Sequence, residues 1–242
     1  IAEASDPRRA REYYAEAARL DPSNPSGLLD HARSQLDAGH LSTAEEAYRK
    51  ILVSSPGGAG DRVKFHARLG IASVSMYRGK FSTAMSQYEE ARSVAGQHLS
   101  NNSAEWRHEA AEYHTKVALL QSAEGNFDEA LKSYQTAHEI LRWFSNDHPE
   151  IRWQHDLWAS HIHIAEILVA KRAPAEAQKS ALAALKMAKE RSAAEPDNAN
   201  WQHCLFVTYE VIGKIFLLFG DFDSSEYFFN LATNIVDQLI SL

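Results

Sequence analysis

The chain of 242 residues is 45% hydrophobic and 24% charged, the composition of an ordinary globular protein, which excludes wholesale disorder. Its 25 Lys and Arg against 32 Asp and Glu give a net charge of −7, so nucleic acid and anionic membranes are poor partners. The single cysteine excludes an intrachain disulfide framework, and the longest apolar run, residues 215–219, is far shorter than the roughly 20 residues of a membrane helix.

Apolar residues recur at helical spacing along nearly the whole chain, and no segment alternates as a strand does. Taken in chain order, the pattern predicts helices over 7–20, 25–38, 41–54, 61–78, 81–97, 103–124, 127–145, 149–171, 174–194, 199–219 and 222–240. All seven prolines stand at the starts of these helices or in linkers. The sequence therefore predicts an all-α fold of about 11 helices, one leading helix followed by five antiparallel pairs.

A short motif marks the turn predicted inside each helix pair. A glycine is followed five positions later by a small residue in the copies that begin at Gly39, Gly79, Gly125 and Gly220, and a degenerate copy begins at Arg172. The glycine can adopt the left-handed conformation that ends a helix, and the small residue lets two helices approach closely. A large residue one helical turn later fills the gap. These positions hold Tyr48, Tyr88, Tyr134, Ala181 and Phe229.

A second motif lies near the start of the first helix in each of the last three pairs. It places a tryptophan two residues before a histidine, in the pairs Trp106 and His108, Trp153 and His155, and Trp201 and His203. The tryptophans share a face with apolar residues, which predicts that they belong to the core between repeats. The histidines are predicted to project into a concave surface. They either form a pH-sensitive strip for acidic ligands or were inherited with the duplicated unit and have no separate role.

The register Gly-x-x-x-x-Ala-x-x-x-Tyr-x-x-Ala resembles that of tetratricopeptide (TPR) repeats. The resemblance implies one right-handed α-solenoid, a TPR-like superhelix, over residues 1–242. It would consist of a half repeat over 7–24 and helix pairs over 25–59, 60–102, 103–147, 148–197 and 198–242. A TPR unit typically takes about 34 residues, and the longer copies here resemble the TPR variety of bacterial multidomain signalling proteins.

TPR arrays bind other proteins, so the resemblance implies a scaffold that holds a peptide or helix of a protein partner in its concave groove. The alternative is a sensory or regulatory array of a larger bacterial signalling enzyme or transcription regulator, acting in cis. By the family pattern, and with the three histidines added, the groove residues are Arg33, Asp37, His66, Ser73, Tyr77, His108, Glu112, Thr115, His155, Glu166, His203, Glu210 and Lys214.

The sequence carries no phosphate-binding glycine loop, serine nucleophile elbow or paired-carboxylate constellation, so we expect no catalytic residues and no cofactor. No metal site is expected either, because His161 and His163 point to opposite sides of a helix and the three groove histidines lie on separate helices. The consecutive aromatics Tyr227, Phe228 and Phe229 cannot all face one side, which raises self-association through the C-terminal helix pair. We expect a cytoplasmic location, and the opening at Ile1 leaves open a fragment of a longer chain.

Overall fold

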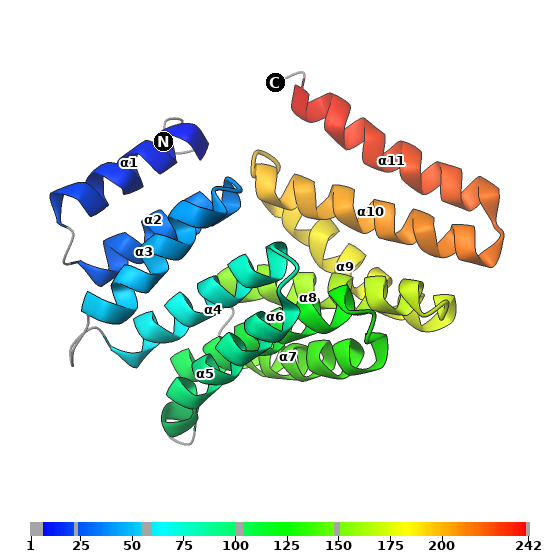
Figure 1. The fold of residues 1–242 in the computed structure, drawn as a ribbon. Coiled ribbons are helices and arrows are strands. Elements are labelled where there is room, and N and C mark those ends of the chain that lie inside the picture. Colours follow the sequence, from blue (N-terminus) through cyan, green and yellow to red (C-terminus); the bar gives the residue numbers. More distant parts are fainter. Residues whose placement is uncertain (1–6, 22–23, 55–59, 100–103, 148–150, 241–242) are drawn as a thin grey trace. The chain divides into compact units, whose positions relative to one another are not determined.

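The computed structural model describes residues 7–21, 24–54, 60–99, 104–147 and 151–240. In these ranges the regular structure is entirely helical (Figure 1). The helices are α1 Pro7–Leu20, α2 Pro25–Asp37, α3 Leu41–Ser54, α4 Asp61–Tyr77, α5 Phe81–Leu99, α6 Ala104–Ala123, α7 Phe127–Asp147, α8 Ile151–Ala170, α9 Pro174–Ala194, α10 Ala199–Phe219 and α11 Phe222–Ile240. The predicted all-α fold is confirmed, and the predicted helix ends differ from the observed ones by no more than two residues.

The turns inside the pairs follow the predicted motif. Gly39 has a φ of 76°, and its amide donates to the carbonyl of Leu36, 2.9 Å away, while His40 donates to Gln35. These two hydrogen bonds satisfy carbonyls that the end of α2 would otherwise leave unpaired. In the degenerate copy Arg172 takes the same place with a φ of 57°, the only positive value on a residue other than glycine among the described residues. The motif therefore marks a backbone conformation, and the degenerate copy retains it.

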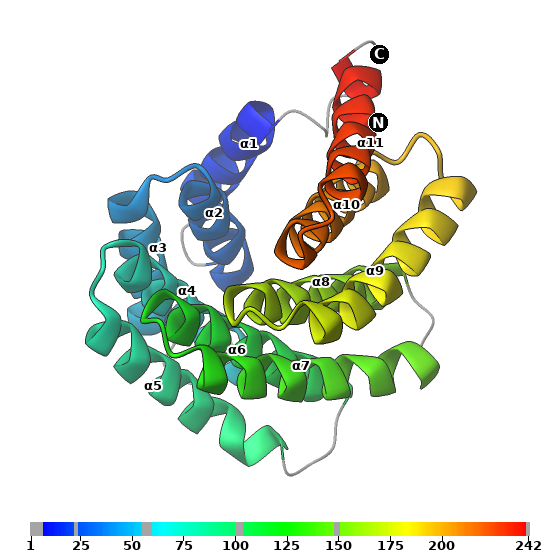
Figure 2. The ribbon, with the colours of Figure 1, turned by 90° about the vertical axis from the view of Figure 1, so that its right-hand side faces the viewer.

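The chain divides into two compact units, Ile1–Leu120 and Gln121–Leu242. The arrangement of the two units as one continuous superhelix stays a prediction. In unit 1, α2 lies beside α3 and α4 beside α5 (Figures 1 and 2). Helix α4 contributes to two cores: Ile71 and Val74 pack with α2 and α3, whereas Phe65 and Leu69 pack with α5 and α6. Helix α4 is therefore the central element of unit 1.

Unit 2 is built around α10. Trp201, Cys204 and Ile212 pack against α8 and α9, and Tyr209 packs against α11. Trp153 and Trp201 are buried, which confirms the prediction that these tryptophans belong to the core. Trp106 in unit 1 is partly buried against the core of α4, α5 and α6.

Helix α10 is the one described helix that is long and apolar enough to cross a membrane by length and composition alone. This is weak support for a span, because the core helix of a globular repeat passes the same test. Helix α10 packs against α8, α9 and α11, and 39% of its apolar stretch is buried inside the protein. Part of its apolar surface therefore belongs to the core of unit 2.

Candidate functional site

Unit 1 contains a hollow of about 530 Å³ at the C-terminal ends of α2 and α4. Three of its residues belong to the groove that the sequence predicts: Asp37 on α2, and Ser73 and Tyr77 on α4. Lys116 of α6 lies on the same hollow. The remaining lining residues are Leu36, Gly39 and Leu41. Helices from three successive repeats thus supply one surface that carries a carboxylate, an ammonium group and a phenol.

The side chains of the hollow differ in how available they are to a ligand. The ring of Tyr77 is 64% exposed, and Asp37 is exposed at the last position of α2. Ser73 is buried, and its hydroxyl donates to the carbonyl of Leu69, 3.0 Å away in the same helix. A ligand in the hollow would therefore meet Tyr77 and Asp37 first, while Ser73 forms part of the floor.

Further residues of the predicted groove lie near the hydroxyl groups of two buried tyrosines, Tyr48 and Tyr88. Burial raises the pKa of Tyr48, and the charges of Arg33, Asp37 and Glu112 act on the same hydroxyl. Burial also raises the pKa of Tyr88 to about 12, and that hydroxyl lies near Ser73, Tyr77 and Glu112. The predicted groove residues Arg33, Asp37, Ser73, Tyr77 and Glu112 are thus gathered around the ends of two buried rings.

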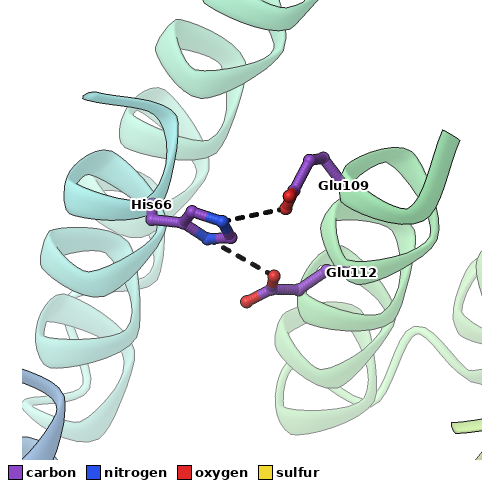
Figure 3. A group of neighbouring side chains, drawn as sticks. All are labelled: His66, Glu109 and Glu112. Carbon is purple, nitrogen blue, oxygen red and sulfur yellow. Dashed lines mark ion pairs between the residues drawn. The ribbon is translucent and has the colours of Figure 1, made fainter. Parts of the chain in front are cut away.

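A second cluster joins α4 to α6 (Figure 3). His66 Nε2 lies 2.9 Å from Glu109 Oε2, and His66 Nδ1 lies 3.4 Å from Glu112 Oε2. Arg62 Nε donates to the other oxygen of Glu109 at 2.6 Å. Burial would raise the pKa of Glu109, but the neighbouring His66 and Arg62 outweigh burial and hold that pKa below its usual value. Glu109 is therefore a buried carboxylate.

The face of α6 that meets α4 carries residues that the sequence did not single out. The sequence predicted His108, Glu112 and Thr115, whereas Glu109 and Glu112 contact His66 and Lys116 lines the hollow. Of the predicted three, Glu112 contacts His66, and His108 and Thr115 are both partly buried. Glu109 and Lys116 were missed, although their spacing of three and four residues from Glu112 places all three on one helix face.

The two groove histidines of unit 2 lie against aromatic rings. His155 lies 5.5 Å from Trp158 and 5.9 Å from Trp201, measured between ring centroids. His203 lies 6.1 Å from Phe206 in the same helix. Packing against these rings explains the positions of the two histidines. The contacts give no support to a ligand that both histidines would bind.

The remaining predicted residues of unit 2 are spread over α8 and α10. Glu166 Oε2 lies 3.7 Å from Nδ1 of His163, one turn away on α8. Glu210 is partly buried and Lys214 is exposed, both on α10. A hollow of about 310 Å³ in this unit is lined by other residues, Gln154, Met187, Glu190 and Arg191. The stronger candidate site is therefore the hollow of unit 1.

No known protein-family profile matches this chain. It is similar to the "Protein CTR9 homolog" of Arabidopsis thaliana, with 34% identity over 85 residues, which are 35% of this chain and 7% of that protein. Two solved structures resemble it over almost its whole length. BtubC from P. vanneervenii gives a TM-score of 0.68 at 16% identity and covers 100% of this chain and 92% of its own. A signal-transduction ATPase with numerous domains and a tetratricopeptide repeat sensor, from Pyrococcus horikoshii, gives 0.74 at 16% identity over 95% of this chain.

These likenesses concern the fold. The chain spans 31% of the ATPase and 7% of the plant protein, so the activities of those whole proteins do not transfer to it. The helix pairs, the turn motif and the two similar structures all indicate a helical-repeat fold for the described part of the chain.

Proposed function

We propose that this chain, which has the fold of the tetratricopeptide-repeat proteins, is a non-catalytic binding module that holds an extended segment of a partner protein in the hollow of unit 1. The proposal rests on one observation above all. Helices of three repeats converge on a hollow of about 530 Å³ that is lined by the exposed Tyr77 together with Asp37 and Lys116. Binding pockets typically measure about 300–1,000 Å³.

The chemistry of the hollow favours a peptide that carries both an apolar side chain and charges. Tyr77 offers a broad apolar face with a polar tip, and Leu36 and Leu41 add aliphatic surface. Asp37 and Lys116 can each pair with a group of opposite charge on the ligand. A uniformly basic or acidic ligand would meet one repulsive charge, so we propose that the ligand carries charges of both signs.

Replacing Tyr77 by alanine is expected to weaken peptide binding at least tenfold, because an exposed aromatic side chain in a hollow is a typical binding anchor. Peptides would be selected from a random display library with the full chain, and their dissociation constants measured by fluorescence anisotropy. Tyr13→Ala is the matched control, since Tyr13 of α1 is similarly exposed, at 67%, outside the hollow. Selected peptides that bind the Tyr77→Ala chain as tightly as the natural one would contradict the proposal.

A second candidate function is a sensory or regulatory array that acts in cis within a larger protein. The observation in its favour is that one similar structure is a signal-transduction ATPase whose tetratricopeptide part is described as a sensor. The gene around the codon for Ile1 distinguishes the two proposals. A coding sequence that continues upstream into a catalytic domain favours the regulatory array. A start codon beside Ile1 excludes an array that regulates a domain on its N-terminal side.

We also propose that unit 2 self-associates through its C-terminal helix pair. Five large apolar side chains are exposed at the end of α10 and the start of α11: Leu217, Leu218, Phe219, Phe222 and Tyr227. Sedimentation-velocity ultracentrifugation is expected to show a concentration-dependent dimer that Phe222→Ser shifts toward monomer. A monomer at all concentrations up to the highest soluble one would overturn this proposal.

A further inference from the structure

His66, Glu109 and Glu112 form a cluster in unit 1 whose chemistry differs from that of the hollow. One nitrogen of His66 and one oxygen of each glutamate lie within 4.8 Å of one another (Figure 3). We propose that these three side chains bind one divalent transition-metal ion, for which Zn²⁺ is the best fit, and that the ion ties α4 to α6. This proposal is independent of peptide binding.

The donor set suits zinc. Imidazole nitrogen and carboxylate oxygen are both common zinc ligands, at about 2.0–2.2 Å from the metal. Tetrahedral ligands at that range lie roughly 3.3–3.6 Å from one another. His66 Nε2 lies 2.9 Å from Glu109 and His66 Nδ1 lies 3.4 Å from Glu112, and a metal ion takes only one of the two nitrogens. One carboxylate therefore has to move toward the nitrogen that the other carboxylate already faces, and the three ligand atoms start within 4.8 Å of one another. That movement would complete three protein ligands and leave a fourth position open.

Two buried atoms of the cluster lack a hydrogen bond. These are Nδ1 of His66 and Oε2 of Glu109, whose side chains are only 10% and 1% exposed. The ring of His66 lies close to both carboxylates, but its N–H directions do not make well-aligned hydrogen bonds to them. Buried polar atoms are nearly always satisfied, because an unpaired one loses its interaction with water without compensation. A cation bound to Nδ1 of His66 would satisfy that nitrogen, and Oε2 of Glu109 would join it by moving from its place beside Nε2.

The surroundings of the cluster fit a metal site as well. Arg62 donates to Oε1 of Glu109, which orients the carboxylate and leaves Oε2 facing His66. Hydrogen bonds of this kind to a ligand position it and tune its affinity for the metal. Glu112 is 29% exposed, so its side of the cluster is open to an entering ion. With a neutral histidine the two carboxylates outweigh the charge of Arg62, and the cluster attracts a cation.

The test uses the full chain, stripped of metal with a chelator and titrated with Zn²⁺ in competition with a chromophoric chelator. We expect one tight equivalent of Zn²⁺ and a rise in the melting temperature on binding. Glu112→Gln is expected to weaken that equivalent at least tenfold and to abolish the rise. Because Glu112 is partly exposed, this variant should keep its fold, which circular dichroism would verify. His66→Gln should give the same result.

A matched control is available in unit 2. Oε2 of Glu166 lies 3.7 Å from Nδ1 of His163, so this is a similar histidine–glutamate pair. Glu166→Gln should leave the affinity for Zn²⁺ unchanged. X-ray absorption of the zinc-loaded chain should show nitrogen and oxygen ligands without sulfur. The proposal fails if the natural chain binds no tight equivalent, if Glu112→Gln binds Zn²⁺ as well as the natural chain, or if Cys204→Ser removes the bound ion. In the first case, a protonated His66 between two carboxylates explains the cluster.

Discussion

Gly70→Ala is expected to lower the free energy of unfolding by about 2–3 kcal/mol, although alanine is the better helix former by about 1 kcal/mol. Gly70 lies in the middle of α4, directly under the ring of Tyr48 from α3. A Cβ atom at this position would lie 2.2 Å from Cζ of Tyr48 and 2.4 Å from Cε2. The ring is buried and packed on several sides, so it cannot move aside without opening a cavity.

The matched control is Gly96→Ala in α5, where an added Cβ meets no atom within 4 Å. It should stabilise the chain by about 0.5–1 kcal/mol, through helix propensity alone. Tyr48→Leu combined with Gly70→Ala should recover part of the loss, because the shorter side chain frees the space. Unfolding in urea would be monitored by the hydrogen exchange of peptides from α3 and α4. These peptides report on the stability of unit 1 even if the two units unfold separately. Equal stability of the Gly70→Ala and Gly96→Ala chains would contradict this explanation of the close approach.

The helices could be predicted from the sequence because their signals are local. A glycine in the left-handed conformation, a proline at a helix start and apolar residues at helical spacing each act within a few positions. Even Arg172 was placed correctly, since the motif around it kept its spacing after the glycine was lost. The division into units 1 and 2 could not be predicted in this way. It falls within α6, where no linker or change in composition marks it.

The candidate site could be predicted only in part. Asp37, Ser73 and Tyr77, which the sequence assigns to one groove, line one hollow, because the repeat fixes which face of α2 and α4 turns inward. On α6 the sequence indicated His108 and Thr115, and it did not indicate Glu109, which contacts His66, or Lys116, which lines the hollow. Helix α6 buries residues on several sides, so its apolar pattern does not define a single inward face. The buried residues are Glu109, Ala110, Ala111, Tyr113, Val117, Ala118 and Leu120.

The contact between His66 and Glu109 could not be predicted from the sequence either. The two residues lie in neighbouring repeats, and a charge on one helix does not reveal which side chain of the next helix approaches it. The expectation of no metal site considered histidines alone and did not include carboxylates from a second helix. Only the packing of α4 on α6 brings the three side chains together.

Lowering the pH from 6.5 to 4 is expected to destabilise unit 2 through two histidines between α7 and α8. The rings of His138 and His161 lie 4.5 Å apart, and Nδ1 of His138 lies 2.9 Å from the hydroxyl of Ser160. Burial, and next the neighbouring His138, lower the pKa of His161 to about 4. Burial also lowers the pKa of His138; Arg142 lowers it further and Glu139 opposes this. The ring of His161 is therefore neutral in the folded protein at pH 6, and folded His138 binds its proton less readily than an unfolded histidine.

The sign of the effect follows from which state binds the proton. An unfolded histidine titrates near pH 6.5, so between pH 6.5 and 4 the unfolded chain takes up a proton that folded His161 refuses. The contribution of His161 is fully present above pH 6.5 and is lost as the pH falls toward 4, by about 3 kcal/mol at most. His155 acts in the opposite direction. The carboxylate of Asp156, whose Oδ1 lies 3.9 Å from Nδ1 of His155, and next Cys204 raise the pKa of His155 to about 9, so its contribution is present below pH 6.5 and is lost as the pH rises through 9.

The measurement is urea unfolding of the natural chain and of His161→Gln at pH 7, 5.5 and 4.5. Carboxylates that titrate in this range affect both chains alike, so the difference between the two isolates His161. We expect the natural chain to lose more stability on acidification than His161→Gln, whereas His155→Gln should flatten the dependence only above pH 6.5. Parallel profiles for the natural and His161→Gln chains, or a His161 ring that titrates near pH 6.5 by NMR, would show that this ring is hydrated. In that case the packing of α7 on α8 would be looser than the structure implies, because only a ring shielded from water keeps so low a pKa.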